Sequence, residues 1–235
     1  MLLFRRIPNI LVNQDFRSLF RRIGYEVKLS YPTNLIILLF PLFAFVIYSQ
    51  APGDAQSKQQ NTLIIFEVVF PILAAFTASS MIVYQQEVAS LEYLAVRQSL
   101  SKVWAFRSLL QLAWIAFVLV LVVWGHNAFY FEVNITAILI TAAAPAAGLI
   151  ALANLAALIF IDTQVGLVLA SAWWAFCLLF SQAAYQIIGS NLFLFPSLFG
   201  FNQGLLANKI YLLGVAVGMF VLCLYLLKRT ARLFP

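Results

Sequence analysis

The chain has 235 residues, of which 64% are hydrophobic and 9% are charged, and its formal net charge is +6. A soluble domain carries about 25% charged residues, and a soluble fold of this size could not hide so much apolar surface behind a wettable exterior. The composition therefore excludes a soluble protein. Lipid offers no hydrogen bonds, and the apolar runs are continuous rather than alternating, so we expect an all-α integral membrane protein and not a barrel.

The N-terminal residues 1–33 are predicted to be a cytoplasmic segment that contains an amphipathic interface helix. From Asp15 to Ser30, apolar residues recur every three or four positions, while basic residues occupy the other faces. A helix that is aromatic on one side and basic on the other lies well in a membrane interface. The residues that define this interface helix are Phe16, Arg17, Phe20 and Arg21.

Six apolar stretches follow, which predicts six transmembrane helices within a domain that covers residues 34–227. A helix needs about 20 apolar residues to cross the hydrocarbon core. The polar residues 50–61 are expected to form a loop after the first span, and Ile161–Gln164 to form a tight turn after the fourth. The six predicted spans are 34–49, 62–84, 104–124, 133–160, 165–188 and 210–227.

The segment between the fifth and sixth spans, residues 189–208, is apolar but irregular. Pro196, Gly200 and Gly204 interrupt it, so we expect it to stay near the membrane without crossing it. Short re-entrant or interfacial helices fit this pattern best. The last residues, 228–235, are predicted to be a cytoplasmic tail.

The basic residues predict the orientation of the chain in the membrane. Of the 14 Lys and Arg residues, all except Lys58 and Lys209 fall in the N-terminal segment, in the region 85–107 or in the tail. The positive-inside rule therefore places both termini in the cytoplasm of a cell (inner or plasma) membrane. The basic excess is then a topological signal with an attraction to anionic membrane lipid, and no nucleic acid partner is expected.

Polar side chains inside lipid are costly, so those within the spans are candidates for a substrate path. Glu67, in the second span, either contacts substrate or a proton near the outer mouth of a pathway, or lies close enough to the outer interface to reach water. Asn154, in the fourth span, either holds helices together, which is the favoured reading, or faces a cavity. Gln182 and Tyr185, near the outer end of the fifth span, could line a portal.

Small residues predict where helices approach closely. Alanines form a stripe in the fourth span, and Gly214 and Gly218 form a GxxxG pair in the sixth. The alternative is that alanine and glycine are simply common in membrane helices. The alanine stripe consists of Ala143, Ala147 and Ala151.

The sequence contains no HExxH, no GxSxG and no GxxxxGK[ST] motif. The chain is therefore not expected to be an enzyme by itself, to hold a metal or to split ATP with a P-loop. If it moves a substrate uphill, the energy has to come from an ion gradient or from another subunit.

The predicted cytoplasmic loop 85–102 reads Glu87-Val-Ala-Ser-Leu-Glu-Tyr-Leu94 at its start. It resembles the E-x-G-[ST]-L-E-x-L pattern at the end of the second span in the permease subunits of type-2 ABC (ABC-2 type) exporters. Ala89 stands where that family usually has glycine, and Gln98 stands near its usual proline. The basic interface helix, six spans, cytoplasmic termini and half-helices before the last span resemble that family as well.

In that family the loop forms a coupling helix that docks into the ATP-binding subunit. The resemblance therefore implies a permease subunit that works with an ATP-binding cassette subunit and with a second copy or a related permease. ATP and Mg would be bound by the partner, and this chain would bind no cofactor. The residues implied in coupling are Glu87, Ser90, Leu91, Glu92, Leu94 and Arg97.

The apolar, aromatic spans, with 22 Phe in the chain, favour an amphiphilic or hydrophobic substrate such as a lipid-linked molecule, a peptide or a drug. Three alternatives stay open. The chain could be the membrane subunit of a haem or cytochrome-maturation exporter, or a membrane immunity or scaffold protein that transports nothing. A gradient-driven transporter is the third, and it would require Glu67 to titrate.

Overall fold

The computed structural model describes residues 35–49, 55–78, 100–130, 132, 134–189, 192–199 and 205–230. The chain divides into two units, Met1–Pro32 and Thr33–Pro235, and every described residue belongs to the second. The predicted interface helix and the coupling residues Glu87–Arg97 lie outside the described residues, so both stay predictions.

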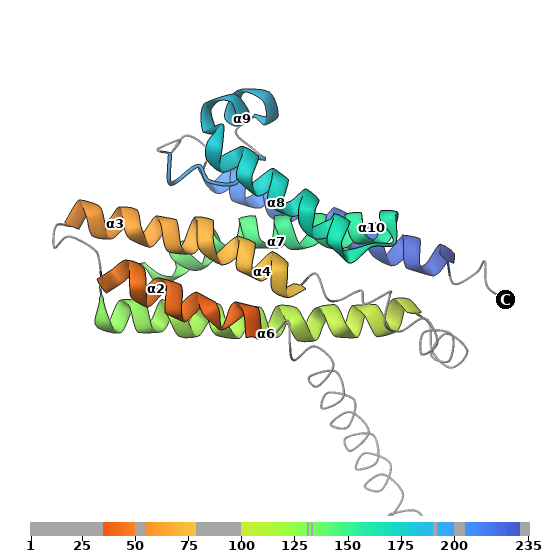
Figure 1. Cartoon of the computed structure of the whole chain (residues 1–235), viewed down its shortest axis with the longest axis horizontal. Coiled ribbons are helices and arrows are strands. Elements are labelled where there is room, and N and C mark those ends of the chain that lie inside the picture. Colours follow the sequence, from red (N-terminus) through yellow and green to blue (C-terminus); the bar gives the residue numbers. More distant parts are fainter. Residues whose placement is uncertain are drawn as a thin grey trace, which may run out of the picture. The chain divides into compact units, whose positions relative to one another are not determined.

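The described part of the chain is all-helical and contains no strand (Figure 1). One long helix is made of three consecutive pieces, because a π-helical stretch, η1, interrupts it between α3 and α4. The elements are α2 (Leu39–Ser49), α3 (Ala55–Leu63), η1 (Ile64–Val69), α4 (Phe70–Ala78), α6 (Leu100–Phe129), α7 (Ile135–Phe160), α8 (Thr163–Leu179), α9 (Ser181–Ile188) and α10 (Leu205–Thr230).

Four helices among the described residues are long and apolar enough to cross a membrane, and α8 with α9 makes a fifth if this bent pair counts as one span. The prediction of an all-α protein with several helices able to cross a membrane is therefore confirmed for the described residues, whereas six spans are not. The first predicted span contains only a shorter apolar helix, Leu35–Ile47, of about 20 Å at 1.5 Å per residue. The four long helices are Ser57–Ala78, Trp104–Phe129, Ile135–Phe160 and Leu205–Arg229.

Two boundaries differ from the prediction. The expected loop 50–61 is helical from Ala55 onward, because α3 runs directly into η1 and α4. The expected fifth span, 165–188, is broken at Phe180, where α8 and α9 meet at 110°. The 17 residues of α8 measure about 25 Å, close to the thickness of the hydrocarbon core. Because α9 changes direction at Phe180, it does not continue the path of α8, and Gln182 is exposed on α9.

Helix α7 lies at the centre of the bundle and packs against η1, α4, α6, α8 and α10. Its inner positions are mostly alanines, and their small side chains let the neighbouring helices approach closely. The tight turn predicted at Ile161–Gln164 is confirmed. Ile161 adopts a left-handed conformation (φ 54°), and the Asp162 carboxylate accepts a hydrogen bond from the Gln164 N–H at 2.8 Å, which caps α8.

Among the glycines that the structure describes, Gly166 on α8 lies closest to a neighbouring helix. A Cβ atom there would lie 2.3 Å from the Ala153 carbonyl oxygen of α7 and 3.0 Å from the Ala157 Cβ. At the predicted GxxxG pair, Gly214 and Gly218, a Cβ atom would meet nothing within 4 Å. Close packing inside this chain therefore depends on a glycine that the sequence motif did not indicate.

Candidate functional site

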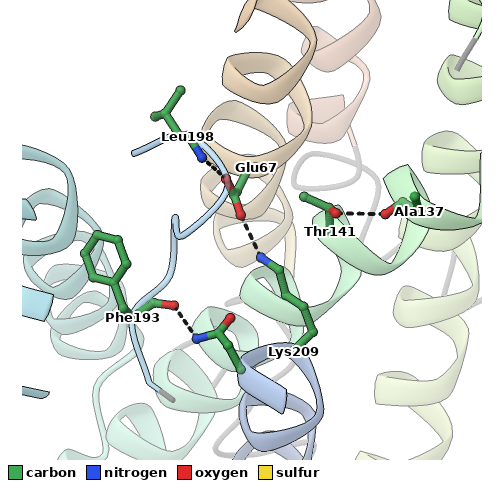
Figure 2. Close-up of polar contacts among 7 residues, drawn as sticks. Glu67, Ala137, Thr141, Phe193, Leu198 and Lys209 are labelled. Carbon is green, nitrogen blue, oxygen red and sulfur yellow. Dashed lines mark hydrogen bonds and ion pairs between the residues drawn. The ribbon is translucent and has the colours of Figure 1, made fainter. Parts of the chain in front are cut away.

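A buried ion pair joins η1, in the long helix Ser57–Ala78, to the start of α10. The Lys209 ammonium donates to Glu67 Oε1 at 2.7 Å (Figure 2). Glu67 is 0% exposed and Lys209 is 1% exposed, so neither charge reaches solvent. Charges held inside a membrane protein are rare, and each requires a partner of opposite sign, as these two have.

The position of Glu67 depends on the π-helical stretch η1. Glu67 lies inside this stretch, and Pro71 follows one turn later. At its end, the Phe70 N–H bonds to the Ile65 carbonyl, five residues back rather than four. Proline has no N–H and disturbs the helical ladder before it, and π-turns accommodate such disturbances. Because a π-turn inserts an extra residue, it changes which face of the helix carries Glu67.

The second carboxylate oxygen of Glu67 binds a non-helical segment. Residues 192–199, which we call the plug segment, run between α9 and α10, and the Leu198 N–H donates to Glu67 Oε2 at 2.9 Å (Figure 2). At the other end of the segment, the Asn208 side-chain amide donates to the Phe193 carbonyl at 2.9 Å. The two ends of the plug segment are thus held by side chains from η1 and from α10.

Aromatic side chains surround the same cluster. The Trp174 indole of α8 donates from Nε1 to the Val68 carbonyl of η1 at 3.0 Å, and its ring meets Phe195 edge-on at a centroid distance of 6.5 Å. Phe193 meets Tyr185 of α9 edge-on at 5.9 Å. Residues from η1, α8, α9, α10 and the plug segment therefore form one structural unit.

A second polar group lies between α3 and the end of α6. His126 is buried, and its Nε2 lies 3.4 Å from the Thr62 hydroxyl, which donates to the Lys58 carbonyl at 2.8 Å. The His126 ring contacts Phe66 and Tyr130, and the Lys58 ammonium lies 5.7 Å above the Tyr130 ring. Among the described residues, no three His, Cys, Asp or Glu side chains gather closely enough to hold a metal ion.

The four predicted substrate-path residues have different surroundings. Glu67 is fully buried in the ion pair, so it does not reach water in this structure. Asn154 is also buried, and its amide donates to the Ile150 carbonyl of its own helix at 2.8 Å, which leaves it outside the Glu67 cluster. Tyr185 packs against the plug segment, and Gln182 is exposed on α9.

Sequence reasoning found Glu67 but missed its partners. Lys209 falls between the irregular segment 189–208 and the predicted span 210–227, on the side opposite the basic regions, whereas in the structure it lies within α10. A signal was present, since a carboxylate within an apolar span requires a cation and only Lys58 and Lys209 fall outside the predicted cytoplasmic regions. Asn208 and Trp174 carried no pattern that would have singled them out.

Comparison of the chain with protein-family models, with curated proteins and with solved structures returns no match.

Proposed function

We propose that this chain is the permease subunit of an ATP-driven exporter, which moves an amphiphilic or hydrophobic substrate while a separate subunit hydrolyses ATP. Two copies, or this chain and a related one, would form the pathway with two ATP-binding cassette subunits. The predicted membrane is the cell (inner or plasma) membrane, with both termini in the cytoplasm.

The observation that carries this proposal is the order of elements before the last long helix. An apolar helix, α8, breaks at 110° into α9, and the plug segment 192–199, buried at 193–196, then precedes α10. The resemblance to type-2 ABC exporters predicts half-helices within 189–208, whereas the break lies earlier, at Phe180, and the described residues 192–199 are not helical. What agrees with the resemblance is the broken path of the chain before its last long helix. Lipid cannot pair with the free backbone groups of a broken helix, so an apolar segment with such breaks has to be buried in protein or line a cavity. A broken apolar segment before the last helix therefore supports a protein that encloses a pathway.

The sequence of the predicted loop 85–102 gives independent support. Glu87, Glu92 and Arg97 supply charges that orient a docking contact, while Leu91 and Leu94 supply an apolar knob that can be buried. A contact that transmits force needs both features in a short element. The chain has no P-loop of its own, so ATP has to be bound by a partner.

Co-purification tests the proposal most directly. The tagged chain is extracted from its host membrane in mild detergent, and the proteins that accompany it are identified and quantified by mass spectrometry. We expect an ATP-binding cassette subunit at one-to-one stoichiometry, and we expect the double substitution Glu92→Ala/Leu94→Ala to remove it. The matched control is Gln164→Ala, an exposed residue at the turn between α7 and α8 on the same predicted side of the membrane, which should keep the partner.

Two other outcomes would contradict the proposal. A chain that emerges without any nucleotide-binding partner, as a stable oligomer, would favour the immunity or scaffold reading. A partner that stays bound at full stoichiometry after the double substitution would show that the loop 85–102 does not carry the contact.

A further inference from the structure

We propose that Glu67 and Lys209 are positioning residues that hold the plug segment 192–199 inside the bundle, so that substrate can pass this end only when the Leu198 N–H leaves Glu67 Oε2. The consequence for transport rests on the proposed function. The attachment of the plug segment does not, and it can be tested on the isolated chain.

The middle of the plug segment, residues 193–196, is buried although it is not helical. Phe193, Leu194 and Phe195 are at most 1% exposed, and Pro196 is buried as well. Non-helical backbone at membrane depth needs hydrogen-bond partners from elsewhere in the protein, because lipid supplies none. Glu67 and Asn208 supply one partner at each end of this segment. The attachment of the segment therefore depends on a few named side chains.

Glu67 uses its two oxygens for two different elements. Oε1 accepts from Lys209 of α10, and Oε2 accepts from the Leu198 N–H of the plug segment. The Lys209 ammonium provides the counter-charge to the buried carboxylate, and a carboxylate oxygen is a strong hydrogen-bond acceptor. If α10 moves away from η1, the Glu67 carboxylate loses its counter-charge, and an unpaired charge is costly to keep buried. The Glu67 side chain would then leave this position, and the hydrogen bond from the Leu198 N–H would break with it.

This arrangement predicts a specific result for a charge reversal. The double substitution Glu67→Lys/Lys209→Glu keeps two opposite charges facing each other, so the link between η1 and α10 should survive. It also places an ammonium, which is only a donor, against the Leu198 N–H, which is also a donor. The reversal should therefore restore the helix contact without restoring the attachment of the plug segment.

A cysteine at Ser197 reports whether the plug segment is attached. The Ser197 hydroxyl oxygen is buried, so a thiol there should react slowly with a polar maleimide while the segment is in place. The chain is placed in lipid nanodiscs, which expose both membrane faces and require no assumption about orientation. Each variant is measured with and without Ser197→Cys, so any reaction of the two native thiols, Cys177 and Cys223, is subtracted.

We expect labelling of the Cys introduced at 197 to be at least about tenfold faster in Lys209→Met, in Glu67→Leu and in the charge reversal than in the parent chain. Thr141→Val is the matched control, because the Thr141 hydroxyl bonds to the Ala137 carbonyl of its own helix (Figure 2) and its rate should not change. The charge reversal should melt within a few degrees of the parent chain, which separates loss of the plug attachment from unfolding.

Two results would overturn the inference. Labelling at the parent rate in Lys209→Met and Glu67→Leu would mean that the pair does not hold the segment. Slow labelling in the charge reversal would mean that the ion pair acts only between helices and that the Leu198 contact is incidental.

The transport consequence has its own readout. In the assembled complex, adding ATP and Mg should accelerate labelling in the parent chain but not in the charge reversal, whose segment is already free. If no ATP-binding partner exists while the nanodisc rates follow the expectation, the proposed function fails and the positioning role stands. If the partner is found but ATP leaves the parent rate unchanged, the proposed function stands and the role of this segment in transport is refuted.

Discussion

Replacing Gly166 with alanine is expected to push α7 and α8 apart. The new Cβ atom would lie 2.3 Å from the Ala153 carbonyl oxygen and 3.0 Å from the Ala157 Cβ. An ordinary contact between carbon and a carbonyl oxygen is about 3.3 Å or longer, so the two backbones have to separate by about 1 Å at this point. Neither contact is with the end of a flexible side chain, so local rearrangement cannot relieve it.

The cost can be estimated from two opposing effects. Overpacking a close contact costs about 1–3 kcal/mol, whereas alanine is favoured over glycine within a helix by about 1 kcal/mol. The steric effect should prevail because the strained atom is a backbone oxygen. We therefore expect Gly166→Ala to lower the free energy of unfolding by about 1–2 kcal/mol.

Thermal unfolding in detergent measures this effect, with Gly214→Ala as the matched control. Gly214 also lies inside a long apolar helix, but a Cβ atom there meets nothing within 4 Å, so this variant should melt at the parent temperature or slightly above it. Equal melting temperatures for the two variants would refute the reasoning, because they would show that α7 and α8 tolerate an added methyl group.

Substitutions at three further positions test side-chain hydrogen bonds by the same unfolding assay. Trp174→Phe keeps an aromatic ring but removes the N–H that donates to the Val68 carbonyl at 3.0 Å, and a loss of about 1 kcal/mol is expected; an unchanged melting temperature would mean that this bond adds nothing. Asp162→Ala removes the cap of α8 and should cost about 1 kcal/mol, whereas Asp162→Asn, which keeps a capping oxygen, should cost much less. Thr62→Val removes both the 2.8 Å bond from the hydroxyl to the Lys58 carbonyl and the 3.4 Å contact with His126 Nε2, and should cost about 1 kcal/mol; an unchanged melting temperature would mean that neither contact contributes.

The long helices were predictable because hydrophobicity is a local property of the sequence. The third and sixth predicted spans each lie inside a helix of the structure that extends beyond them, as 104–124 does within α6, and the fourth, 133–160, ends with α7 at Phe160. The turn at Ile161–Gln164 was predictable for the same reason, since a polar tetrapeptide interrupted two apolar runs. The break at Phe180 was not, because no proline or glycine marks it and the apolar pattern continues across it.

The candidate site was only half predictable. Glu67 stood out as a charge within an apolar run, but its partner Lys209 is 142 residues away in the sequence. Helix periodicity could not have matched the two, because the π-turn at 64–69 shifts the face on which Glu67 lies. Likewise, GxxxG spacing singled out Gly214, whereas the close approach occurs at Gly166, whose role depends on what α7 places opposite it.

The π-helical stretch η1 gives the long helix Ser57–Ala78 one residue more than an α-helix would hold in the same turns. Returning that stretch to α geometry would rotate one half of the helix against the other by about 100° and lengthen it by about 1.5 Å. Both halves would stay helical, and Glu67 would turn off the face that meets Lys209. The extra residue thus sets the register of the helix, and the ion pair fits the π-helical register but not the α-helical one.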